Sequence, residues 1–181
     1  MPGRAGKRVR YDIAVGGLKM PQAVVETLQP LLITDVLDGD TVRDENGTKY
    51  RLYGIDAPER RQPFGPEAKR HLEALIFENN NGRVLAQLHG VDRHGRQLAT
   101  LYQQIPVLRS DNINWLMVSS GLAWVYRFKG EERRRKAEEI APPISSYDTV
   151  EGYVRRQRWG LWDQASPERP SDYRKRMKLK E

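Results

Sequence analysis

The chain contains no cysteine, so its fold uses no disulfide bond and no thiolate metal site. Long apolar runs are absent too, since no stretch approaches the roughly 20 apolar residues that a membrane-spanning helix needs. The basic segment from Met1 to Arg10 is followed by a mixed, glycine-containing segment rather than by the apolar core of a signal peptide. We therefore expect either a cytoplasmic protein that does not enter a membrane or a processed or trimmed form of a longer chain, and we favour the first.

Acidic residues are outnumbered by basic ones. The 181 residues include 31 Lys and Arg against 24 Asp and Glu, which gives a net charge of +7. A basic chain of this length fits one domain, acting as a monomer, that binds nucleic acid or another polyanion. A basic solvated surface with no such partner fits the charge as well, so the charge alone does not decide.

The order of predicted elements indicates an α+β fold with a small β-barrel. We expect an N-terminal extension (1–29), one domain (30–163) and a mobile, basic C-terminal tail (164–181). Strands are predicted over 31–37, 84–89 and 97–102. Helices are predicted from Gly65-Pro66 to Asn81-Gly82, after Ser110-Asp111, over 131–140, and over 148–158 with Ser145-Ser146 as its cap.

Asn46-Gly47 is the strongest short-range hairpin signal in the chain. If these two residues form the turn, Val42 lies opposite Arg51 and Asp40 lies opposite Tyr53. Asp40 and Arg51 would then be diagonal neighbours on one face of the sheet. A longer turn would shift this register.

Three carboxylates and two guanidinium groups point to phosphodiester chemistry. They belong to Asp40, Asp56, Glu59, Arg51 and Arg96. Carboxylates can hold a hard cation and orient water, and arginines can grip phosphate. Each residue taken singly also has an ordinary explanation, such as a surface turn or an exposed ion pair.

Six blocks of the sequence, in this order, resemble one known family. The blocks are Asp38-Gly39-Asp40-Thr41-Val42, Arg51 to Glu59, Gly65-Pro66-Glu67-Ala68, Asp92-Arg93-His94-Gly95-Arg96, Gly121 to Tyr126 and Gly160-Leu161-Trp162. The family is that of the staphylococcal (micrococcal) nucleases, or thermonucleases. The resemblance covers about residues 31 to 162, so it rests on more than one short motif.

The resemblance implies a five-stranded OB-type barrel with three or more packed helices. It also implies a hydrolase, an endonuclease that cuts DNA and RNA with the help of calcium and with low sequence specificity. Calcium would be held by the carboxylates of Asp40 and Asp56 and by the backbone carbonyl of Ala57. Glu59 would orient or deprotonate the attacking water, and the catalytic arginines that bind the scissile phosphate would be Arg51 and Arg96.

Further residues receive weaker roles by the same resemblance. Asp38 and Thr41 would support the metal ligands from behind. Substrate contacts are expected from five residues: Asp92, Arg93, His94, Tyr126 and Phe128. For the last two, packing in the core is an equally good explanation. His94 also stands where the staphylococcal enzyme has a base-stacking tyrosine, which leaves the choice between DNA and RNA open.

A second hypothesis is a non-catalytic OB-type module that binds nucleic acid. Domains of this kind have lost the acidic and arginine side chains of the catalytic site. All five catalytic positions here hold the expected residue types, which favours the enzyme.

Overall fold

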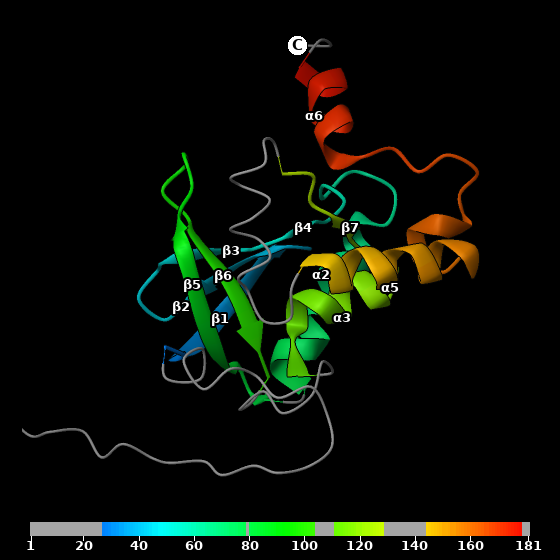
Figure 1. The fold of residues 1–181 in the computed structure, drawn as a ribbon. Helices are drawn as coiled ribbons and strands as arrows, with labels where there is room; N and C mark the ends of the chain where they lie inside the picture. The colour runs from blue at the N-terminus through cyan, green and yellow to red at the C-terminus, as the bar shows by residue number, and fades with distance from the viewer. Residues whose placement is uncertain (1–26, 79, 104–110, 129–143, 179–181) are drawn as a thin grey trace, which may run out of the picture.

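A closed five-stranded barrel forms the centre of the computed structural model (Figure 1). The structure describes residues 27–78, 80–103, 111–128 and 144–178. The barrel strands are β1 (Gln29–Asp38), β2 (Thr41–Asp44), β3 (Lys49–Leu52), β6 (Gln97–Tyr102) and β5 (Arg83–Val91), in that spatial order. Only β3 and β6 pair in parallel; the other neighbours, including β5 with β1, are antiparallel.

Helices α2, α3 and α5 gather on one side of the barrel, and the predicted α+β fold is confirmed (Figure 1). The helical segments are α2 (Gly65–Glu73), which continues as the π-helix η1 (Ala74–Glu78), α3 (Ile113–Ser119), α5 (Ile144–Arg156), the 3₁₀-helix η3 (Gly160–Asp163) and α6 (Pro170–Lys178). A separate two-stranded sheet pairs β4 (Ile55–Asp56) with β7 (Trp124–Val125). In the described part of the chain, no helix is both long and apolar enough to cross a lipid bilayer.

The core fills the barrel and extends under α2. Leu52 and Leu101 are fully buried barrel residues, as expected where alternate strand residues point inward. The helix adds Ala68, Leu72 and Ile76, which recur at helical spacing and are also fully buried in the same cluster. The apolar stripe of α2 therefore attaches the helix, and the loop that precedes it, to the barrel.

Asn114 ties α3 to the barrel through hydrogen bonds. Its side-chain amide donates to the backbone carbonyls of Tyr53 at 2.9 Å and Ala99 at 3.0 Å, and its side-chain oxygen accepts from the backbone N–H of Leu101 at 3.0 Å. The residue is fully buried, so removing the amide would cost three buried hydrogen bonds that water does not replace.

The predicted hairpin register is wrong by one residue. Thr41 pairs with Arg51, and Val42 pairs with Tyr50. Asp40 precedes β2 and lies outside the strand pair, so it approaches Arg51 from the turn between β1 and β2 rather than as a diagonal neighbour.

The shift arises because the turn has three residues, 45–47, instead of two. The carboxylate of Asp44 accepts hydrogen bonds from the backbone N–H groups of Asn46 at 3.0 Å and Thr48 at 2.8 Å, and from the hydroxyl of Tyr50 at 3.0 Å. Gly47 adopts a φ of 82°, the left-handed conformation that closes a three-residue hairpin loop. The buried carboxylate of Asp44 thus selects the longer turn.

Two predicted helix starts differ from the structure. The N-cap of α3 is Asn112, whose side chain accepts from the backbone N–H of Trp115 at 2.8 Å. Asn112 itself is extended and forms a β-bridge with Tyr102, so the regular helix begins after it, at Ile113. α5 begins at Ile144, which places Ser145-Ser146 inside the helix. The predicted helix over 131–140 lies outside the described residues.

Part of the predicted mobile tail is an ordered helix, α6. It starts at Pro170, a residue suited to the first turn because it lacks a backbone N–H. Arg176 on α6 bonds to both carboxylate oxygens of Glu168, at 2.9 and 2.7 Å. The division of the chain into extension, domain and tail otherwise stays a prediction.

His89 of β5 supplies a pH-dependent test of this fold. Its ring stacks on Tyr53 with centroids 4.5 Å apart and hydrogen bonds to Thr100 at 2.8 Å. Burial lowers the pKa of His89 to about 4. Between about pH 6.5 and pH 4, His89 is therefore protonated in the unfolded chain but neutral in the folded chain. The folded state loses stability as the pH falls through this range.

We predict that His89→Gln, which can keep the bond to Thr100, is protected from this loss. Between about pH 7.5 and about pH 5, the free energy of unfolding should fall by roughly 2 kcal/mol more in the unmodified protein than in the variant. Urea unfolding at both pH values measures the difference, and carboxylate titrations common to both proteins cancel. An equal change in the two proteins would contradict the prediction.

Candidate active site

Arg51 holds two buried carboxylates together. Its Nη2 lies 3.1 Å from Oδ2 of Asp40 and 3.0 Å from Oδ1 of Asp56, and all three side chains are nearly buried, with 11%, 9% and 7% of their areas exposed. Its Nη1 donates to the backbone carbonyls of Leu52 at 2.6 Å and Ile55 at 2.8 Å. The guanidinium is therefore fixed from both ends, with strand β3 behind it and the acids in front.

Asp40 is oriented by three neighbours. Its Oδ2 accepts from the backbone N–H of Ala57 at 2.8 Å, and its Oδ1 accepts from the hydroxyl of Thr41 at 3.0 Å. Its own backbone N–H donates to Oδ1 of Asp38 at 3.0 Å. Asp38 and Thr41 thus support Asp40, as the resemblance implied, and the bond to Ala57 brings the β1–β2 turn against the segment that follows β4.

Gly39 allows this close approach. A Cβ atom at Gly39 would lie 2.7 Å from the Cβ of Ala68 on α2 and 2.8 Å from the Cβ of Ala57. Both distances are too short for any side chain, so the three small residues form a junction in which the turn, the loop and the helix meet. The junction keeps Asp40 beside Asp56.

The carboxylates crowd one another. Burial, followed by the charge of Asp40, raises the pKa of Asp38 to about 7. Burial also raises the pKa of Asp56 to about 6, although the charge of Arg51 opposes the shift. Because burial is the main cause of both shifts, the charged forms of these carboxylates are poorly solvated, and a cation beside them would favour those charged forms.

The donor atoms of this cluster fit a hard divalent cation. Among the described residues, no group of three or more His, Asp and Glu side chains is arranged to hold a metal ion. The carboxylates of Asp40 and Asp56 nevertheless converge on one nitrogen of Arg51, so the pair already shares one positive group. Carboxylate oxygens supplemented by a backbone carbonyl are ligands that suit calcium rather than a tetrahedral zinc site.

Arg96 reaches the cluster from the β5–β6 turn. Its Nε and Nη2 bond to Oδ2 of Asp92 at 2.8 and 2.7 Å, and its Nη1 lies 3.4 Å from the hydroxyl of Thr41. Asp92 also accepts from the backbone N–H groups of His94 and Arg96, and these bonds hold its pKa below the usual value even though burial opposes them. Asp92 thus fixes the turn and aims Arg96, while Arg93 and His94 are exposed at its tip.

Glu59 lies at the rim, in a loop built on Gln62. The backbone N–H of Glu59 donates to Oε1 of Gln62 at 3.0 Å, and the backbone N–H of Gln62 donates back to the Glu59 carbonyl at 2.8 Å. A Cβ at Gly65 would lie 2.0 Å from that carbonyl oxygen, so the loop can fold only over a glycine. The carboxylate of Glu59, 36% exposed, forms an ion pair with Arg174 of α6.

Sequence reasoning gave Gln62 no role and did not relate Arg174 to Glu59. Gln62 is 3% exposed, and nothing in its local sequence distinguishes it from a polar loop residue. Arg174 comes from a segment 115 residues away from Glu59, and no local pattern relates the two.

An aromatic row borders the site. Phe128 lies between Tyr126 and Tyr53, with ring centroids 5.0 and 5.3 Å away. Tyr126 is 42% exposed, and Phe128 is partly buried against the core. Tyr126 is thus the more accessible of the two rings, and Phe128 packs between it and Tyr53.

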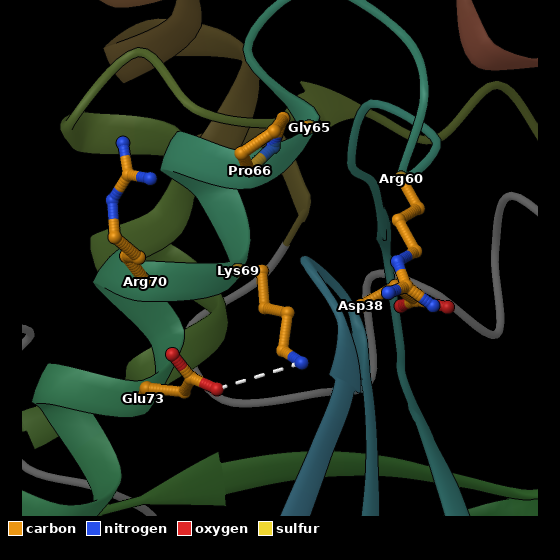
Figure 2. A pocket seen from close by; sticks show the side chains of 7 residues that line it. All are labelled: Asp38, Arg60, Gly65, Pro66, Lys69, Arg70 and Glu73. Atoms are coloured by element: carbon orange, nitrogen blue, oxygen red, sulfur yellow. Dashed lines mark ion pairs between the residues drawn. The ribbon is translucent and has the colours of Figure 1, made fainter.

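A pocket of about 300 Å³ opens beside Asp38 (Figure 2). Three of the side chains that line it are basic, so positive charge lies next to the carboxylate cluster. Arg60, Lys69 and Arg70 contribute to the lining. Lys69 lies 3.6 Å from Glu73 in an exposed pair of little strength. Basic side chains on such a surface can contact the phosphates of a nucleic acid that passes next to the cluster.

Comparison with known proteins agrees with this geometry. A family model described as "Staphylococcal nuclease homologue" matches residues 49–164. The chain is 33% identical over 153 residues to a protein named micrococcal nuclease from Shigella flexneri, covering 81% of this chain and 80% of that protein. It is 32% identical over 151 residues to an endonuclease of Haemophilus influenzae, covering 81% of this chain and 74% of that one. The family-model match contains Arg51, Asp56, Glu59 and Arg96, whereas Asp40 precedes it.

The glycine junction generates a direct test. Gly39→Ala should destabilise the fold by roughly 1–3 kcal/mol, because the new methyl group overlaps the side chains of Ala57 and Ala68. It should also displace Asp40. Gly152→Ala is the matched control, since a Cβ there meets only the end of Arg156 at 3.6 Å and alanine favours a helix.

Thermal or urea unfolding of the two variants checks this. The control should be unchanged or more stable by up to about 1 kcal/mol. If Gly39→Ala were as stable as the control, the packing described at the junction would be incorrect.

Proposed function

We propose that this chain, which belongs to the staphylococcal nuclease family, is a calcium-dependent nuclease. It would hydrolyse phosphodiester bonds of DNA, RNA or both with low sequence specificity. The observation that carries the proposal is the convergence of Asp40, Asp56 and Arg51 in one buried cluster, with Glu59 at its rim and Arg96 joined to it through a hydroxyl.

The two arginines would bind the scissile phosphate. Arg51 is held in place by two backbone carbonyls and by the two carboxylates, so its position is fixed before a phosphate arrives. Arg96 is oriented by Asp92. Charge grows on the phosphate oxygens as phosphorus becomes five-coordinate, so guanidinium groups placed there stabilise the transition state more than the substrate. Loss of either would lower the rate by about 10²–10³-fold.

Asp40, Asp56 and the backbone carbonyl of Ala57 would hold the calcium ion. The ion would neutralise part of the negative charge of the phosphodiester and polarise it toward attack by water. The protein prepares for it by orienting Asp40 through Thr41 and the Ala57 N–H. The raised pKa of Asp56, caused mainly by burial, marks a carboxylate that gains from a second positive neighbour.

Glu59 would take the proton of the attacking water. Its carboxylate is partly exposed and faces the cluster from the loop after β4, so water can reach it. The water oxygen forms a bond to phosphorus while its proton passes to Glu59, and the bond to the leaving oxygen breaks. The leaving oxygen takes a proton from solvent. By the family resemblance, we expect the break that leaves a 3′-phosphate end.

Release of acid-soluble nucleotides from DNA and from RNA tests the proposal. Activity should appear with calcium, disappear with a chelator and fall by about 10²–10⁴-fold in Glu59→Gln, because the general base is lost. Glu67→Gln is the matched control: this exposed glutamate on α2 forms only a weak pair with Arg70 at 3.5 Å, and its activity should be unchanged.

Two results would decide against the mechanism. Full activity in the chelator would exclude the metal, and full activity of Glu59→Gln would exclude this base. Tight binding of nucleic acid with no cleavage under any divalent ion would instead support the non-catalytic OB-type module.

A further inference from the structure

Arg174 of α6 reaches into the candidate active site from outside the family-model match. The match ends at residue 164, and α6 follows at Pro170–Lys178, where it lies beside the loop after β4 (Figure 1). Its Nη1 bonds to Oε1 of Glu59 and lies 3.7 Å from Oδ1 of Asp56. An arginine thus faces both the proposed base and a proposed metal ligand.

The position of α6 does not depend on Arg174. The side chain of Gln62 donates to the backbone carbonyl of Glu168, and Arg169 reaches the carbonyl of Val125 at 3.5 Å. Pro170 is buried. These contacts anchor the start of the helix, so Arg174 is presented to the site by a support that would survive its substitution.

One oxygen of Asp56 already lies between two guanidinium groups. Oδ1 of Asp56 is 3.0 Å from Nη2 of Arg51 and 3.7 Å from Nη1 of Arg174. Two arginines that converge on one anionic oxygen are arranged as they would be around an oxygen of a phosphate. Arg51 approaches from β3 and Arg174 from α6, so an anion that enters between them would be held from two sides.

The negative charge of the site would repel a polyanion, and a third arginine would reduce that repulsion. Four acids, Asp38, Asp40, Asp56 and Glu59, surround the place where a polyanion must bind. Arg174 keeps its positive charge throughout, because an arginine guanidinium does not lose its proton in a protein. It is 45% exposed, so an incoming phosphate can reach it.

We propose that Arg174 is a further substrate-binding residue that contacts a phosphate of the nucleic-acid backbone at this site; the proposal rests on the function proposed above. Without substrate, Arg174 is paired with Glu59. When nucleic acid binds, the guanidinium moves from the carboxylate to a phosphate oxygen. The same movement frees Glu59 to accept the proton of the attacking water.

Binding of a fluorescent single-stranded oligonucleotide in calcium tests this in a Glu59→Gln background. That background prevents cleavage and removes the carboxylate charge, so Arg174 can no longer act merely by neutralising Glu59. Adding Arg174→Gln should weaken binding by about 10-fold. The slope of log affinity against log salt concentration should also become shallower, by the amount that corresponds to the loss of about one phosphate contact. Adding Lys175→Gln instead, next on the helix and paired with Asp172, should weaken binding by less than about 2-fold.

Each other outcome overturns the inference. Unchanged affinity in Arg174→Gln would mean that the ion pair only fastens the helix, and tighter binding would mean that Arg174 blocks the site. Equal losses in both double variants would mean that only overall charge matters. If the wild-type protein cleaves nucleic acid while any of these holds, the inference alone fails; if it neither cleaves nor binds, the proposed function fails with it.

Discussion

The site depends on one buried electrostatic arrangement, in which the Arg51 guanidinium lies between the carboxylates of Asp40 and Asp56. Burying such groups is costly, and removing one partner of a buried ion pair typically destabilises a protein by about 3–5 kcal/mol. Burial raises the pKa values of Asp38 and Asp56, so the charged forms of these carboxylates are poorly solvated. Buried carboxylates of this kind add little to stability, and a cation beside them would favour their charged form.

The barrel matters because it fixes the parts of the chain that carry these groups. Strand β3 supplies Arg51, the β1–β2 turn supplies Asp40, and β4 supplies Asp56. Two glycines allow these parts to lie close together. Gly39 leaves room for Ala57 and Ala68, and Gly65 leaves room for the backbone carbonyl of Glu59. The chain after residue 164 adds Arg174, so a segment beyond the family-model match places a positive charge next to Glu59.

The fold class and the clustering of Asp40, Arg51, Asp56 and Glu59 could be predicted, because strand periodicity and short motifs are local and the resemblance relates them to one another. The hairpin register could not, because it is set by the buried Asp44 carboxylate, which bonds to three groups beyond it in the chain. Gln62 and Arg174 were out of reach for a similar reason. Their importance comes from contacts made only after folding, the Gln62 amide with residue 168 and the Arg174 guanidinium with residues 56 and 59.

The central claim is that this cluster is a binding site for one hard cation. Calorimetric titration of calcium into the nucleic-acid-free protein, alongside a folded Asp56→Asn variant, tests it most directly. The account predicts one calcium ion bound per chain by the unmodified protein and binding at least about 10-fold weaker in the variant, because a charged ligand is lost. No binding by the unmodified protein, or equal binding by both, would contradict it.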